Sequence, residues 1–178
     1  MASLLRSCGR RNAVGRRDYA LLMLLVRLGL RASEVVQLQL DDIDWLNGEI
    51  LVRGKGRRCE RLPLPPDVGE ALAAYLRRGR PPGGSRALFL RAKAPHDGLR
   101  PTSITCIVYR AGDRAGLSRV GAHRLRHTAA TEMLHAGAPL SEIAQVLRHR
   151  TATTTAIYAK VDRRQLRELA QPWPGGTA

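Results

Sequence analysis

One apolar run constrains this chain more than any other feature. Residues 19–30 are almost all hydrophobic, and Arg27 interrupts them near the end. A membrane-spanning helix needs about 20 apolar residues, so this run predicts a buried helix of a globular domain and excludes a transmembrane protein. Gly29 favours a helix C-cap, and we therefore expect the helix to cover residues 18–28.

The charge of the chain is strongly basic. The 178 residues include 30 Lys and Arg against 15 Asp and Glu, which gives a formal net charge of +15. Residues 1–17 and 77–93 carry basic side chains and no acidic ones, whereas residues 18–52 are acidic overall. This alternation favours a folded domain with one electropositive face, and a polyanion such as nucleic acid is the simplest partner. The alternative is a soluble, arginine-rich protein from a high-GC genome.

The cysteines indicate a reducing environment. Cys8, Cys59 and Cys106 are odd in number, lie far apart and form no CxxC pair. A disulfide framework or a zinc finger is therefore not expected. The first residues also lack an apolar segment followed by a cleavage site, and we predict a cytoplasmic protein with no membrane partner.

Turn and cap signals predict a mainly α fold with a small antiparallel β-sheet (α+β). Asn47-Gly48 is a strong hairpin signal, and Pro65-Pro66 stops the second strand of the hairpin. Predicted strands cover 49–53, 58–64 and 87–90. Predicted helices, after the first, cover 33–38, 67–78, 102–115, 122–136, 140–147, 153–159 and 162–170. We expect a flexible basic arm over 1–15, one domain over 16–172 and a disordered tail over 173–178.

Two candidate cations lie at turns. Arg31 sits between the end of one predicted helix and the start of the next, where backbone amides favour an anion and a planar guanidinium suits phosphate oxygens. Lys55 lies between two glycines at an exposed hairpin turn. The alternatives are a surface arginine after a capping glycine and an ordinary polar turn.

A histidine-rich helix provides the next candidates. His123 and Arg126 are three residues apart and share a helix face, so together they are suited to hold a phosphate and move a proton. His123 and His127 are four apart and offer a metal pair instead. We predict no metal, because no HExxH motif and no matching third ligand is present.

His149 and Tyr158 complete the set. His149 closes a predicted helix, where a histidine is a common cap. Tyr158 follows it by nine residues, after a threonine run. Taken singly, each has an ordinary structural interpretation. Tyr19, Tyr75 and Tyr109 lie in apolar helical settings and are interpreted as core residues.

The order of these residues, with the words GLRASEV, GKG, HRLRHT, LRH and TTTAIYAKVD, resembles the tyrosine recombinase (phage integrase) family from about residue 16 to residue 171. The resemblance implies the C-terminal catalytic domain of a site-specific recombinase or integrase over 16–172. Such a domain cleaves and rejoins DNA through a 3′-phosphotyrosine. It also implies that no cofactor is needed, since the energy of the broken phosphodiester is kept in the phosphotyrosine.

The resemblance also assigns roles by position. Tyr158 is the implied nucleophile, Lys55 protonates the leaving 5′-oxygen and His123 assists proton movement at the tyrosine. Negative charge on the phosphorane is stabilised by Arg31, Arg126 and His149, with Glu34 bracing Arg31 and His127 in support. The expected contacts to DNA backbone are Arg53, Arg57, Arg58, Arg124, Arg148 and Arg150. The implied partners are double-stranded DNA and further copies of the chain, as a tetramer on DNA and a monomer when isolated.

Two departures accompany this resemblance. Arg148 stands where the family usually has glycine, and only about 15 residues precede the first core helix. We therefore expect the N-terminal core-binding domain of the family to be absent. A non-catalytic or decayed DNA-binding protein using the same basic face is the main alternative. A type IB topoisomerase-like strand transferase is a weaker one.

Overall fold

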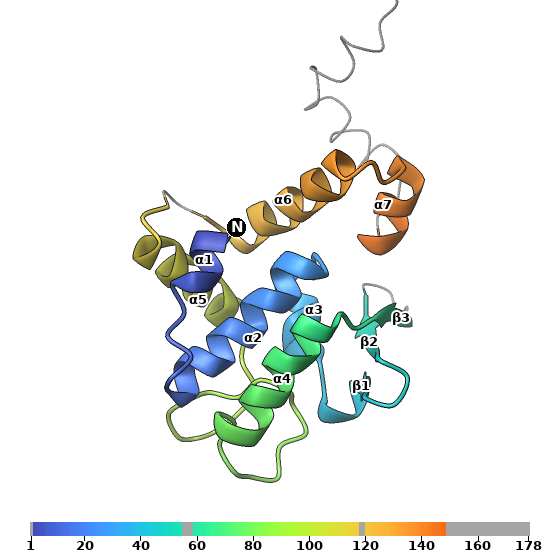
Figure 1. Ribbon diagram of the computed structural model, residues 1–178. Helices are drawn as coiled ribbons and strands as arrows, with labels where there is room; N and C mark the ends of the chain where they lie inside the picture. Colours follow the sequence, from blue (N-terminus) through green and yellow to red (C-terminus); the bar gives the residue numbers. More distant parts are fainter. Residues whose placement is uncertain (1, 55–58, 118–119, 149–178) are drawn as a thin grey trace, which may run out of the picture. The chain divides into compact units, whose positions relative to one another are not determined.

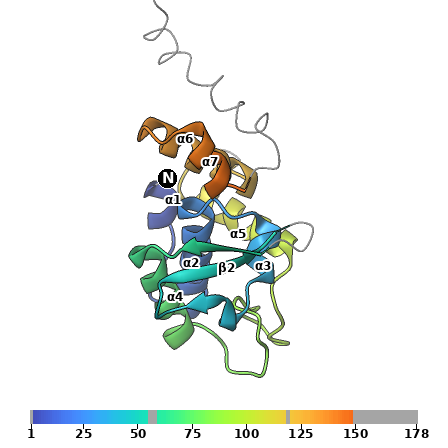
Figure 2. The same cartoon turned by 90° about the vertical axis from the view of Figure 1, so that its right-hand side faces the viewer.

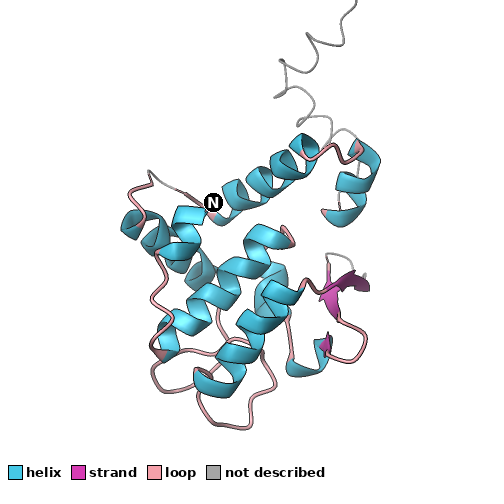
Figure 3. Ribbon diagram, viewed as in Figure 1, coloured by secondary structure: helices cyan, strands magenta, loops and turns pink. Residues whose placement is uncertain are grey.

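The computed structural model describes residues 2–54, 59–117 and 120–148. The chain forms two compact units, residues 1–129 and 130–178, which we describe separately. Helices dominate the described residues, and one small antiparallel sheet accompanies them (Figure 1, Figure 3). The predicted fold class, mainly α with a small antiparallel sheet, is thus confirmed.

The described helices and strands follow the predicted order closely. The α-helices are α1 (Ala2–Arg6), α2 (Ala13–Arg27), α3 (Ala32–Gln37), α4 (Pro66–Arg78), α5 (Pro101–Arg114), α6 (Ala122–His135) and α7 (Leu140–Val146). The strands are β1 (Ile43–Asp44), β2 (Glu49–Arg53) and β3 (Cys59–Pro63), and a short 3-10 helix, η1 (Leu40–Asp42), precedes β1. The two helices predicted over 153–159 and 162–170 lie outside the described residues.

The apolar run forms the central helix of the first unit, as predicted. Residues 20–26 of α2 are buried, and α2 packs lengthwise against α4 (Figure 1). Helix α2 begins five residues earlier than expected, because the Asn12 side chain caps it by accepting a hydrogen bond from the Gly15 amide at 2.7 Å. Gly29 follows the helix with a φ of 58°, a left-handed conformation that glycine adopts without steric cost.

The sheet is a hairpin extended by one short strand. In the order β1-β2-β3, Ile43 pairs with Ile50 and Val52 pairs with Glu60, all antiparallel (Figure 2). Ile50 and Val52 point into the core while their neighbours are half-exposed, which is the alternation of a one-sided sheet. The sequence predicted the turn before β2 but not β1, a strand of only two residues.

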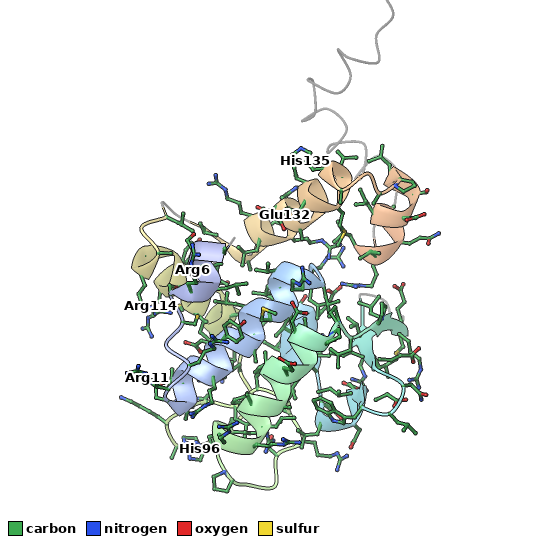
Figure 4. The ribbon with its side chains drawn as sticks, viewed as in Figure 1. Arg6, Arg11, His96, Arg114, Glu132 and His135 are labelled. Atoms are coloured by element: carbon green, nitrogen blue, oxygen red, sulfur yellow. The ribbon has the colours of Figure 1, made fainter. Side chains whose placement is uncertain are left out.

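The segment expected to be a basic arm contains a helix instead. Helix α1 buries Leu4 completely, and the Ser7 hydroxyl following it donates a hydrogen bond to the Ala111 carbonyl of α5 at 3.0 Å. Leu5 also packs against the core and Cys8 is buried in it, but so short an apolar pattern beside Arg6, Arg10 and Arg11 did not predict a helix. Arg6 and Arg11 lie on the edge of the unit away from the sheet (Figure 4). Arg114, on the same edge, donates a hydrogen bond to the Ser7 carbonyl at 3.1 Å.

The prediction of a strand over residues 87–90 was wrong, because the structure has two isolated bridges there and no paired strand. Ala87 makes a single bridge with Gln39, and Leu90 makes a single bridge with Gly98. Leu88, Phe89 and Leu90 are buried, but the chain bends at Leu88 and Phe89 and pairs with two different neighbours for one residue each. An apolar run of this length predicts burial and does not reveal whether a continuous partner exists.

The second unit has its own small core. Ala130, Ile143 and Leu147 are buried together, with Met133 and Leu134 packed on them. Helix α7 begins after Pro139 and ends with Leu147 as its C-cap. In the part of the chain that the structure describes, no helix is long and apolar enough to cross a membrane.

Candidate functional site

Arg31 is held at the start of α3 by a carboxylate. The guanidinium Nη1 donates to Glu34 Oε1 at 2.7 Å, and the Arg31 backbone amide donates to Glu34 Oε2 at 2.8 Å. Glu34 is 3% exposed, whereas the Arg31 side chain is 41% exposed. A buried carboxylate thus fixes an arginine whose outer part still faces solvent, which is the bracing expected for this pair.

Arg126 lies on α6, near the end of the first unit, and its side chain contacts the turn between α2 and α3. Its side chain is buried, with 4% exposure, and Nη1 donates to the Gly29 carbonyl at 2.6 Å. The positive φ of Gly29 turns the chain at the end of α2. One hydrogen bond therefore ties α6 to the turn that carries Arg31.

These two arginines line one cavity with His123. The cavity has a volume of about 400 Å³, and its walls come from the turn before α3, from α5 and from the start of α6. The polar side chains on it are Arg31, Ser33, Thr105, Tyr109, His123 and Arg126. Three positions assigned by resemblance, far apart in sequence, thus meet in one place. A hollow with two guanidinium groups favours an anion such as phosphate.

Two residues that line the cavity were not predicted from the sequence as members of the site. Tyr109 was interpreted as a core residue, but it is 43% exposed and lines the cavity. Thr105 lies one helical turn before it on α5. The available signal was the four-residue spacing of Thr105 and Tyr109, which places these two hydroxyl-bearing side chains on one face of the helix.

His123 and His127 contact each other directly. Their Nε2 atoms lie 2.8 Å apart and the rings meet edge to face. Burial, followed by the charges of His123 and Arg126, lowers the pKa of His127 below its usual value. Within the described ranges no group of three His, Cys, Asp or Glu side chains is arranged to hold a metal ion.

The residues predicted to contact DNA backbone have different surroundings. Arg53 forms an ion pair with the buried Asp42, and this hydrogen bond raises the pKa of the guanidinium. Arg53 therefore has a structural role at the end of β2. Arg124 is exposed on α6, where a side chain is accessible to a ligand. Lys55, His149 and Tyr158, with Arg57, Arg58 and Arg150, lie outside the described residues.

Arg148 has an unusual backbone conformation. It follows α7 with a φ of 54°, in the left-handed region, and its Nη1 donates to the Val146 carbonyl at 3.1 Å. A residue with a Cβ is strained there by about 1–2 kcal/mol. The usual glycine of the resembled family is the residue that this position favours.

We expect Arg148→Gly to raise the free energy of unfolding by about 0.5–1 kcal/mol. The gain is smaller than the relieved strain because glycine also increases the entropy of the unfolded chain. Urea unfolding measures the change, and Arg148→Ala is the matched control, since it removes the guanidinium and keeps the strained Cβ. An equal gain in both variants would show that charge, not backbone strain, is responsible.

Comparison with known proteins identifies the family. The model of the phage integrase family matches residues 1–165, and the chain belongs to this family. It is 55% identical over 178 residues to the proposed integrase/recombinase y4rA of Sinorhizobium fredii, covering 98% of this chain and 43% of that protein. It is 39% identical over 165 residues to tyrosine recombinase XerD of Mycobacterium tuberculosis, covering 89% of this chain and 51% of that protein.

Solved structures support the same fold. The XerA recombinase superposes with a TM-score of 0.80 at 28% identity, covering 94% of this chain and 60% of that one. The XerH site-specific recombinase, solved on palindromic difH substrate as a post-cleavage complex, gives a TM-score of 0.80 at 29% identity, covering 97% of this chain and 51% of that one. The chain thus spans about half the length of these relatives.

Proposed function

We propose that this chain is the catalytic domain of a site-specific DNA recombinase that cleaves and rejoins DNA through Tyr158. The observation that carries the proposal is the cavity in which Arg31, His123 and Arg126 meet. Family membership and the DNA-bound XerH relative support double-stranded DNA as the substrate.

The cavity residues suit a phosphodiester whose charge increases during reaction. Tyr158 Oη attacks phosphorus, the new P–O bond forms, and the bond to the 5′-oxygen breaks. The pentacoordinate phosphorane gains negative charge, which Arg31 and Arg126 stabilise because buried contacts already hold them in place. His123 takes the phenol proton.

The remaining roles rest on the family resemblance. Lys55 supplies a proton to the leaving 5′-oxygen, and His149 adds a third donor to the phosphorane. Attack by a free 5′-hydroxyl reverses these steps and reseals the strand. The energy stays in the phosphotyrosine, so the reaction consumes no nucleotide.

A covalent-capture assay tests the proposal. The chain is incubated with a pool of nicked duplexes of randomised sequence, from which the short fragment beyond a cleavage site diffuses away. We expect a protein–DNA adduct on denaturing gels, and after nuclease and trypsin digestion the nucleotide should map to the peptide carrying Tyr158. Binding to the pool without any adduct would overturn catalysis and leave the non-catalytic DNA-binding alternative.

The partners follow from the same proposal. XerH is bound to a palindromic difH substrate, and because a palindrome offers the same half-site twice, it supports binding of more than one copy to a DNA site. We propose a tetramer on DNA and a monomer in its absence, in the bacterial cytoplasm and on the nucleoid. The electropositive face implies that DNA binding weakens steeply with added salt, since bound phosphates release counterions.

A further inference from the structure

The contact between His123 and His127 joins two rings that have different surroundings. His123 is exposed at the cavity wall, and His127 lies half-buried one helical turn behind it on α6. Their Nε2 atoms are 2.8 Å apart, a hydrogen-bond distance. The contact therefore joins a ring that faces the cavity to a ring that does not line it.

A hydrogen bond between two imidazoles requires one proton and one lone pair. If both rings were cationic, each would present an N–H to the other, and the contact would be repulsive. One ring must therefore stay neutral at its Nε2 atom. The burial of His127 and the nearby charges lower its pKa. His127 is therefore the neutral ring of the pair.

The charged groups around the pair also favour a neutral His127. Arg126 on the same helix and Arg31 on α3 are the cations of the cavity, and Tyr109 on α5 is its other titratable group. The two cations disfavour a second positive charge on the helix face. In this contact the neutral His127 thus accepts the hydrogen bond and His123 Nε2–H donates it.

We propose that His127 is a positioning residue for His123: it accepts a hydrogen bond from His123 Nε2–H and so fixes the tautomer of that ring. The Nε2 bond fixes the ring plane and leaves Nδ1 of His123 for the cavity. When His123 receives the proton of the Tyr158 phenol, the resulting imidazolium keeps its Nε2–H on His127. Only the role in DNA cleavage rests on the proposed function.

NMR of the free protein tests the contact without DNA. The tautomer of neutral His123 is read from the chemical shifts of its ring nitrogens in the wild-type chain, in His127→Leu and in His127→Gln. We expect Leu to shift the tautomer ratio of His123 toward Nδ1–H by about three- to ten-fold, because the acceptor for Nε2–H is lost. We expect Gln, whose amide oxygen accepts a hydrogen bond, to restore most of the Nε2–H tautomer. His135→Gln, at the other end of α6, is the matched control and should leave the ratio unchanged.

Single-turnover adduct formation tests the role in cleavage. We expect its rate to fall about ten-fold in His127→Leu and to recover in His127→Gln, in parallel with the tautomer ratio of His123. An unchanged tautomer ratio in the leucine variant, or no recovery with glutamine, would overturn the proposal and leave His127 as packing. The expected tautomer change with no adduct in the wild-type chain would instead refute the proposed function and keep the histidine contact.

Discussion

Replacing Tyr158 by phenylalanine is expected to abolish the covalent protein–DNA adduct while leaving DNA binding within about three-fold of the wild-type value. The substitution removes one oxygen, and this oxygen is the proposed nucleophile, so no other group can form the same bond. The phosphate contacts of the arginines remain. Adduct yield on denaturing gels, compared with the fraction bound in a filter assay, measures the two effects separately.

The cavity itself supplies the control for this experiment. Tyr109 is the tyrosine that the structure places on the cavity wall, and Tyr109→Phe removes the same oxygen from a residue of the same type. We expect this variant to form the adduct. If the adduct survives in Tyr158→Phe and disappears in Tyr109→Phe, the nucleophile has been assigned to the wrong tyrosine.

Replacing Arg126 is expected to give the second-largest loss. At saturating DNA, Arg126→Ala should slow adduct formation by about 10²–10³-fold, the usual cost of losing one preorganised donor at a developing charge. It should also lower the free energy of unfolding by about 1–3 kcal/mol, because the Gly29 carbonyl loses its partner. Arg126→Lys keeps the charge but not the planar fork, so we expect a similar rate loss with a smaller stability loss.

Arg124→Ala is the matched control on the same helix. This side chain is exposed two residues before Arg126, and we expect its removal to weaken DNA binding without changing the rate at saturation. Single-turnover kinetics over a range of DNA concentrations separate the two parameters. A wild-type rate for Arg126→Ala at saturating DNA would refute its role at the phosphorane.

The parts of the fold that could be predicted depend on local chemistry. Gly29 ends a helix because the chain needs a left-handed residue there, and Asn47-Gly48 turns the chain because few other pairs fit such a hairpin. Helix α1 and the bridges of residues 87–90 depend on partners elsewhere in the unit. Their local pattern is too short to indicate those partners.

The candidate site, like the fold, could be predicted only in part. The family resemblance, carried by residue order and the surrounding sequence words, indicated that Arg31, His123 and Arg126 belong together, and all three line the cavity. Tyr109 on the cavity wall and the engagement of Arg53 by Asp42 were not predictable. Both depend on which face of an element the tertiary packing exposes, and an amphipathic pattern locates this face only to within a residue or two.

The hydrogen bond from Arg126 to Gly29 joins residues 97 positions apart. Closing a loop of that length costs conformational entropy before the contact forms, so the cationic hollow exists only once the start of α6 has docked onto the turn after α2. During synthesis, a chain that has emerged as far as α5 carries Arg31 but lacks the second guanidinium. On the proposed function, the hollow that holds the phosphodiester is therefore completed only after most of the first unit has been synthesised and folded.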